Sequence, residues 1–348
     1  MGPFTQASID KERVTMSAVL VEVTRGPMVE NRHRGAIIVV DGEGRRVASV
    51  GEPAMTFMRS SSKPLMVLPL VEQGGAEHFQ LSDEHLAIFA SSHAGEDEHR
   101  RVVAEALEKV GLTEAALSCG THTPFDRKTA DALRAAGQKP TVLHCNCSGK
   151  HTGVLAYAKF KGFELANYTD PSHPAEVDIV TAVADMAGLK TEDVVIGIDG
   201  CSIPVYGMPL ENIALAFARL GLANHGSEAR RTACQRMSQA MVKHPFLISG
   251  TGRLDTDLMK VTEGAVVAKI GADGVYALAV PEKGIGLAAK IDDGNMKMLG
   301  PIVLEALSQL GVLTQEQRAA LATHDKFVIK NNVKQVVGEV RAAFTLEG

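Results

Sequence analysis

Tryptophan is absent from the sequence, and aromatic residues make up only 4% of it. The core must therefore be mainly aliphatic, and 45% hydrophobic residues over 348 positions suffice for one large domain or two smaller ones. Uninterrupted apolar runs stay short of the ~18 residues that a membrane-spanning helix needs. Internal repeats and low-complexity linkers are also missing. We expect residues 17–348 to form a single domain behind a loose extension at residues 1–16.

An excess of charge of either sign is lacking as well. The 36 lysines and arginines nearly balance 41 aspartates and glutamates, and no basic run or basic-aromatic stripe occurs. This composition argues against a nucleic-acid partner. The opening MGPFTQASIDKERVTMSAVLVEV has no charged head followed by a long apolar stretch, so we expect no signal peptide. A soluble cytoplasmic protein is the expectation.

Cysteine occurs at only five positions: Cys119, Cys145, Cys147, Cys201 and Cys234. Their odd number and wide spacing are unlike the disulfide framework of a small secreted domain. Reduced thiols, some of them available to a metal ion, are therefore expected.

The hydrophobic pattern predicts strands near both ends of the domain and helices between them. Predicted strands lie at 17–26, 35–51 and 193–200, with a β-meander at 264–294. Predicted helices lie at 62–75, 97–112, 148–163, 210–222 and 298–313. Residues 84–92 form a short buried segment, 141–146 an extended one, and 201–209 a loop. This order predicts an α+β fold, with helices packed on a mixed, mainly antiparallel β-sheet.

Three serines precede a lysine and a proline in MRSSSKP, residues 58–64. Proline is tolerated in the first turn of a helix, so a helix should start near here, with Ser60 and Lys63 on one face. A serine becomes nucleophilic when a base takes its proton, and a lysine can be that base where burial or nearby positive charge lowers its pKa. The alternative is a polar cap on a buried helix. The spacing alone does not decide between them.

Three further segments carry reactive side chains directly after apolar, strand-like runs. They are Ser91, Ser92 and His93 in AIFASSHAGED, Cys145, Cys147, Lys150 and His151 in TVLHCNCSGKHTG, and Asp199 and Cys201 in VVIGIDGCSIP. Functional residues gather in such loops, so these segments are candidates to complete a site with Ser60.

Zinc is one interpretation of the cysteines. Cys145 and Cys147 could share a strand face and bind the metal with Cys201, and His144 and His151 are possible imidazole ligands. The spacing lacks the paired C-x₂-C pattern of common zinc sites, and by itself it favours buried free thiols acting as small apolar groups.

Two later segments have a functional and a structural interpretation each. In VVAKIGADG, Lys269 stands two residues before a glycine, as in the K-T-G element of serine acyl-transferases, or else it is a lysine at a hairpin edge. GTGRLDT, residues 250–256, is a glycine-rich turn with Arg253 and Asp255. It is either a substrate loop or an ion-paired turn.

Taken together, several segments in order resemble the bacterial L-asparaginase II family, in particular its rhizobial type: VENRHRG, RSSSKP, ASSHAGED, HCNCSGKHTG, IDGCSIP, HPFLISGTGRLDT, AKIGADG and KIDDGN. The resemblance covers residues 17 to about 310. It implies a fold like that of serine β-lactamases and glutaminases. It also implies hydrolysis of L-asparagine to L-aspartate and ammonia by a homodimer.

The resemblance implies roles for individual residues. Two Ser-Lys pairs would be catalytic: Ser60 with Lys63, and Ser92 with Lys269. A Zn²⁺ ion would be bound by Cys147, Lys150 and Cys201. Arg59, His93 and Asp199 are expected to bind substrate, with Asp199 beside the metal.

Ser60 is the expected nucleophile, with Lys63 as its base, and Ser92 is the competing assignment. Zinc is expected to pin loops and position substrate rather than to activate water. The segments SSHAGED and GTGRLDT and a shorter C-terminal part depart from the rhizobial pattern, which bears on substrate affinity and the dimer. A glutaminase, another serine acyl hydrolase, or a non-catalytic zinc-stabilised relative is the alternative, since asparagine and glutamine differ by about one methylene.

Overall fold

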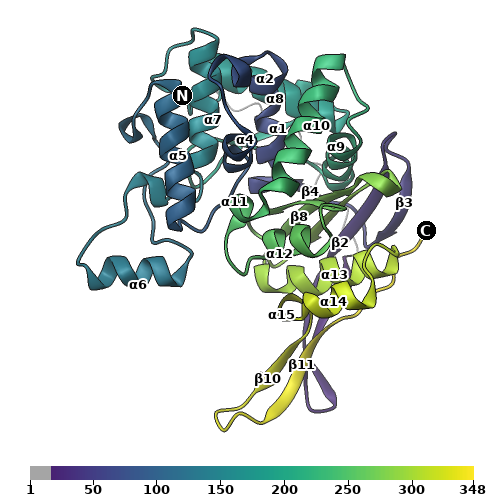
Figure 1. The fold of residues 1–348 in the computed structure, drawn as a ribbon. Helices are drawn as coiled ribbons and strands as arrows, with labels where there is room; N and C mark the ends of the chain where they lie inside the picture. Colours follow the sequence, from purple (N-terminus) through teal and green to yellow (C-terminus); the bar gives the residue numbers. More distant parts are fainter. Residues whose placement is uncertain (1–16) are drawn as a thin grey trace.

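The computed structural model describes residues 17–348, so the predicted extension at residues 1–16 lies outside it. The main sheet has the strand order β10-β11-β1-β2-β9-β8-β7, with β3 paired to β2 (Figure 1). Its strands are β1 (Ala18–Arg25), β2 (Met28–Asp41), β3 (Arg46–Val50), β7 (Val267–Gly271), β8 (Val275–Val280), β9 (Ile285–Ile291), β10 (Phe327–Lys330) and β11 (Val336–Ala342). All of these pairings are antiparallel.

A smaller antiparallel sheet has the order β4-β6-β5, formed by β4 (Met55–Phe57), β5 (Val195–Ile198) and β6 (Pro204–Pro209). The helices are α1 (Lys63–Met66), α2 (Leu68–Glu72), α3 (Gly75–His78), α4 (Asp83–Phe89), α5 (Asp97–Val110), α6 (Arg127–Ala135), α7 (Ser148–Phe160), α8 (Pro174–Ala187), α9 (Leu210–Leu222), α10 (Glu228–Lys243), α11 (Pro245–Ser249), α12 (Leu254–Val261), α13 (Leu299–Gln309), α14 (Gln315–Ala320) and α15 (Ala322–Asp325). The α+β prediction, an antiparallel sheet with helices packed on it, is confirmed.

The core lies where helices cover the sheet. β2 is buried without a break over residues 35–40, because helices cover both faces of the sheet at this point. α9 packs on β2, β8 and β9, and α13 packs on β1, β8 and β11. Gly286 lets α9 approach β9 closely, since a Cβ atom there would lie 2.1 Å from the Ala214 carbonyl oxygen. Figure 1 shows most helices on one side of the sheet and α13 and α14 on the other.

Several local predictions are corrected by the structure. The helix predicted at 62–75 is divided into a 3₁₀ turn (Arg59–Ser62), α1 and α2, and Pro69 lies in the first turn of α2. The strand-like run before Ser91 is helix α4, and the extended segment at 141–146 contains a 3₁₀ turn, Val142–His144. Short apolar runs do not distinguish a buried strand from a buried helix.

Two strand regions come from pairing with distant parts of the chain. The predicted loop at 201–209 contains β6, which lies between β4 and β5. β10 and β11, which the sequence pattern did not predict, join the sheet because β11 pairs with β1. Together with the β1–β2 hairpin they extend beyond the body of the domain (Figure 1). Among residues 17–348, no helix is long and apolar enough to cross a membrane.

Candidate active site

Ser92 lies in the segment directly after α4. Its backbone N–H donates to the Ile248 carbonyl at 2.8 Å, and the neighbouring Ser91 hydroxyl donates to the Ile88 carbonyl at 2.7 Å. Ser92 is only 6% exposed. These contacts fix the backbone from which the Ser92 side chain projects, and such positioning is what a nucleophile or a substrate contact requires.

Two lysine amines converge on the Ser92 hydroxyl. Lys63 Nζ lies 2.9 Å from Ser92 Oγ and 2.7 Å from the Ser91 carbonyl oxygen. Lys269 Nζ, from β7, lies 3.2 Å from Ser92 Oγ and 2.9 Å from the carbonyl oxygen of Ile270. Ser92, Lys63 and Lys269 are all buried and are called the Ser92 cluster below. The structure thus brings together three of the four side chains predicted to be catalytic.

Ser60 is not hydrogen-bonded to any member of this cluster. It is half-buried in the 3₁₀ turn that precedes Lys63, and its hydroxyl makes no hydrogen bond with any residue in 17–348. The Lys63 amine instead turns inward to Ser91 and Ser92, and also to Cys147 Sγ at 3.2 Å. The expected hydrogen-bonded pair of Ser60 with Lys63 is not formed, because the buried amine finds its partners in the interior.

The charge state of Lys269 suits a proton acceptor. Burial lowers its pKa to about 8, against the opposing effect of the Asp255 carboxylate, whose Oδ2 lies 3.6 Å from the amine. The positive charge of Lys63 contributes to the lowering. A lysine with this pKa is partly neutral near physiological pH, so it can take a proton from Ser92 and return it.

The turn at 250–256 is divided between the interior and the surface. Asp255 is 1% exposed and pairs with Lys269, whereas Arg253 lies over the ring of Phe125, 5.6 Å from its centroid. The prediction of an ion-paired turn therefore holds for Asp255, but its partner is Lys269 of β7. The sequence pattern gave Asp255 no catalytic role. Its position beside the Ser92 cluster depends on tertiary structure, which local sequence does not show.

Cys147, Lys150 and Cys201 form a second buried group, called the thiol–lysine cluster below. Cys147 immediately precedes α7, Lys150 lies in its first turn, and Cys201 follows β5. Lys150 Nζ lies 2.9 Å from Cys201 Sγ, and all three side chains are at most 5% exposed. Because Lys63 also touches Cys147, the thiol–lysine cluster adjoins the Ser92 cluster.

The thiols and Lys150 stabilise each other's charges. Hydrogen bonds from Cys145 and Cys201 lower the pKa of Cys147 well below its usual value, and the charges of Lys63 and Lys150 act in the same direction. Burial opposes the charge on Lys150, but Cys147, Cys201 and Asp199 outweigh it, so the pKa of Lys150 is raised. Cys147 therefore favours the thiolate, whereas its hydrogen bond with Cys147 and burial raise the pKa of Cys201.

The donor atoms fit zinc, which favours thiolate sulfur and nitrogen ligands. Among residues 17–348, no three His, Cys, Asp or Glu side chains gather as a metal site, and the Lys150 amine is the nitrogen donor beside Cys201. His144 and His151 each have one ring nitrogen engaged. The Nδ1 atom of His144 accepts from the Thr141 N–H at 3.0 Å, and that of His151 lies 2.7 Å from the Tyr168 hydroxyl. The Nε2 atom of each is buried without a hydrogen-bond partner among the described residues. Cys145 does not share a strand face with Cys147, because this segment is a 3₁₀ turn leading into α7.

The predicted substrate-binding residues have different surroundings. Arg59 Nη2 and Nε lie 2.8 and 3.2 Å from Asp199 Oδ1, and its Nη1 also contacts Asp273. Arg59 has a φ of 50°, a left-handed conformation that is uncommon outside glycine and occurs at ligand sites. His93 is fully buried, and both of its ring nitrogens are occupied, by the Gly95 N–H at 3.1 Å and the Ser148 hydroxyl at 2.9 Å.

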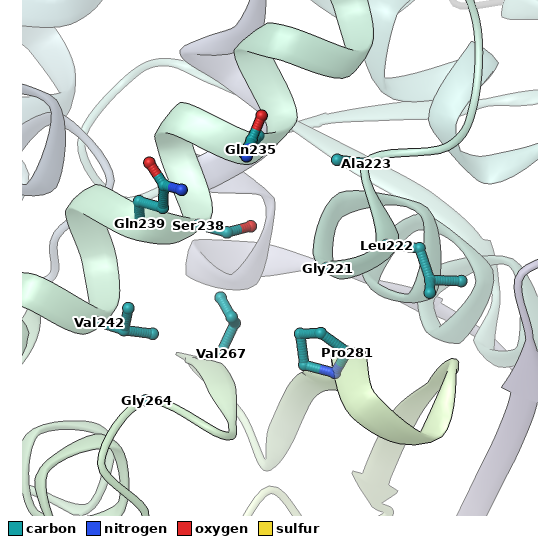
Figure 2. A pocket seen from close by; sticks show the side chains of 10 residues that line it. All are labelled: Gly221, Leu222, Ala223, Gln235, Ser238, Gln239, Val242, Gly264, Val267 and Pro281. Atoms are coloured by element: carbon teal, nitrogen blue, oxygen red, sulfur yellow. The ribbon is translucent and has the colours of Figure 1, made fainter.

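Several cavities border the main sheet. Figure 2 shows one of about 420 Å³ between α9, α10 and the edge of the main sheet, with Gln235, Ser238 and Gln239 from α10 and Pro281 in its wall. It contains none of the predicted site residues. Another, of about 250 Å³, is lined by Ser249 and Asp255 among others, so it reaches the carboxylate behind Lys269.

Comparison with known proteins decides the family. The model of the L-asparaginase II family matches residues 21–342. The chain belongs to the L-asparaginase II family. This confirms the family predicted from the sequence. No curated protein matches the chain.

Three solved structures show distant likeness. Mglu in its native form in 4.3 M NaCl is 15% identical over 80% of this chain and 61% of its own, with a TM-score of 0.43. A Bacillus glutaminase is 13% identical over 80% of this chain and 91% of its own, with a TM-score of 0.39. A β-lactamase from Mycobacterium bovis is 13% identical over 83% and 94%, with a TM-score of 0.40. The chain thus spans about 61% of the length of Mglu, and these likenesses are too distant to transfer chemistry to it.

Proposed function

We propose that the protein is an L-asparaginase of the rhizobial type that acts through a serine acyl-enzyme at Ser92. The observation that carries this proposal is the position of the Ser92 hydroxyl between two buried amines, 2.9 Å from Lys63 and 3.2 Å from Lys269. The proposal thus takes the competing assignment of the two serines. In it Ser92 is the nucleophile, and Ser60 contacts the substrate.

Proton transfer runs through Lys269. Its neutral amine takes the proton of Ser92 as Oγ attacks the side-chain amide carbon of asparagine, and the new C–O bond gives a tetrahedral intermediate. The resulting Lys269 ammonium protonates the leaving nitrogen, so the C–N bond breaks and ammonia departs. Water then attacks the β-aspartyl ester, and Lys269 carries its proton back to Ser92. Lys63 stays hydrogen-bonded to Ser92 Oγ and orients it throughout.

The Arg59–Asp199 pair suits an amino-acid zwitterion. Arg59 offers the planar guanidinium that binds carboxylates, and Asp199, whose side chain is 11% exposed, offers an acceptor for the α-ammonium group. Substrate would then replace the contact that Arg59 makes with Asp273, whose side chain is 69% exposed. Backbone N–H groups near residues 59–63 would bind the oxyanion.

Zinc is proposed as the cofactor of the thiol–lysine cluster. Cys147, Lys150 and Cys201 would bind it, and when bound it supplies a fixed positive charge that holds the start of α7 against the turn after β5. The contact of Lys63 with Cys147 then couples this rigid group to Ser92. A homodimer and a serine β-lactamase-like fold, which rest on the family resemblance, and a cytoplasmic location, which rests on the composition, complete the proposal.

The test is ammonia release from L-asparagine, with L-glutamine in parallel and Ser92→Ala as the matched control. Release from asparagine that is lost in Ser92→Ala supports the proposal. Release mainly from glutamine would keep the acyl-enzyme mechanism but overturn asparagine as the substrate. The substrate pocket would then be deeper, since the two substrates differ by about one methylene. A zinc-loaded, folded protein that releases ammonia from neither would overturn it.

A further inference from the structure

A buried carboxylate lies directly behind Lys269. Asp255, in the first turn of α12, is 1% exposed, and its Oδ2 accepts hydrogen bonds from the Ser249 hydroxyl at 2.9 Å and the Ile270 N–H at 3.1 Å. The Lys269 amine donates to the carbonyl oxygen of the same Ile270 at 2.9 Å. Asp255 and Lys269 are therefore both anchored on Ile270, which fixes the carboxylate relative to the amine.

We propose that Asp255 is the positioning residue for Lys269, holding its amine against Ser92 and making its ammonium form accessible during turnover. The inference rests on the proposed function, in which Lys269 exchanges a proton with Ser92. Asp255 itself lies behind the lysine and acts through it.

Proton balance requires such a group. Lys269 accepts a proton during attack and must donate it to the leaving nitrogen. A fully buried lysine without a counter-ion would stay neutral, because burial disfavours the charged form. It could then act as a base, but the ammonium that protonates the leaving group would be costly to form.

The charges around Lys269 come from several elements. Lys63 from α1 and Arg253, which precedes α12, disfavour the ammonium, whereas Asp255 and the thiolate of Cys147 favour it. Asp255 is the carboxylate among them. Only burial has a larger effect than Asp255 on the pKa of Lys269.

The hydroxyl of Tyr276, from β8, lies beside this carboxylate in the interior. Burial and the neighbouring Asp255 raise the pKa of Tyr276, so the phenol stays neutral beside the carboxylate. Ser249 and Ile270 hold Asp255 Oδ2 in place, while the Lys269 amine can alternate between that oxygen and Ser92 Oγ, which lie 3.6 and 3.2 Å away.

The decisive variant is Asp255→Asn, which keeps the shape but removes the charge. Asp257→Asn is the matched control, because Asp257 lies on the same helix and pairs with His324 at 2.7 Å, away from Ser92. We expect kcat to fall by about 10- to 100-fold in Asp255→Asn and the acid limb of kcat/KM to move down by about one pH unit, because the counter-ion of Lys269 is gone. The control should leave kcat unchanged within about twofold, and it should leave the acid limb of kcat/KM at the same pH.

A second measurement separates this inference from the proposed function. Lysine-labelled free protein is titrated by NMR, with the Lys269 signal assigned by its absence in Lys269→Met. A lower titration midpoint for Lys269 in Asp255→Asn, but not in Asp257→Asn, supports the inference even in a protein that turns over no amide. An unchanged midpoint or an unmoved acid limb would assign Asp255 a purely structural role.

Ser249→Ala keeps the proposal falsifiable if Asp255→Asn does not fold. It removes the hydroxyl that fixes Asp255 but leaves the charge in place. We expect a several-fold lower kcat with an unmoved acid limb, because the amine is less well placed while its counter-ion persists. Wild-type kcat in Ser249→Ala would contradict a positioning role.

Discussion

Lys150 and Lys269 are the same residue type, and each is at most 4% exposed, yet their surroundings shift their charge in opposite directions. Lys269 faces a serine hydroxyl and a second lysine, with Asp255 3.6 Å away, and burial lowers its pKa to about 8. Lys150 faces Cys147, Cys201 and Asp199, which overcome burial and raise its pKa. Burial alone therefore does not decide what a lysine in this protein can do.

This difference gives the two lysines different roles in the proposed mechanism. Lys269 can exchange protons because its two charge states are close in free energy near neutral pH. Lys150 is stabilised as a cation by the thiolate of Cys147 and the carboxylate of Asp199, and it would become a neutral ligand where a metal ion takes over that charge. Lys63 touches Ser92 and Cys147 and so connects the two clusters.

The largest expected effect tests whether the cluster around Lys269 is the reactive one. Ser92→Ala should lower kcat by about 10⁴-fold or more and abolish any covalent adduct, because the nucleophile is gone. Ser60→Ala should lose about 10- to 100-fold and still form an adduct on Ser92, because it removes a substrate contact only. Mass spectrometry of acid-quenched protein locates the adduct. An adduct on Ser60 in the wild-type protein would restore the original order of the two serines.

The sequence predicted this site in part. β1, the meander that carries Lys269, and helices α5 and α9 follow from local periodicity, which is why they are confirmed, whereas β2 begins at Met28, seven residues before the predicted strand at 35–51. β6, β10 and β11 were missed because their pairing partners are far away in the sequence. A strand between two others, or at a sheet edge, carries a weaker local signal than an amphipathic helix.

Side-chain partners were harder to predict than segments. The residues near Ser92 were identified from the family resemblance, but the pairing of Lys63 with Ser92 rather than Ser60 depends on where α4 ends. Asp255 and Lys269 are likewise 14 positions apart and meet only through the packing of α12 on β7. Spacing on one helix predicts a shared face, whereas burial decides which partner an amine takes.

Replacing Lys269 or Lys150 with methionine compares the two lysines directly, with an expected effect on kcat smaller than that of Ser92→Ala. Lys269→Met should lower kcat by about 10²- to 10⁴-fold and leave zinc content unchanged, because a general base is worth that much. Lys150→Met should lose most of its zinc and no more than about tenfold in kcat, because the metal is proposed to position loops. Zinc content measured by elemental analysis and kcat on the same preparations decide the matter. Equal losses of kcat in both variants would mean that zinc takes part in the chemistry.

The smallest expected effect is the pH dependence of the wild-type protein. Lys269 acts as a neutral amine, and its pKa is lowered to about 8, so kcat/KM should fall by about tenfold per unit as pH drops below that value. Above it the amine is already neutral, and the rate should level off. The substrate's own α-amino group affects only the alkaline side, so the acid limb reports the enzyme. If the acid limb lay near pH 4 to 5, a carboxylate would be the base, and the contrast between Lys269 and Lys150 would lose its catalytic meaning.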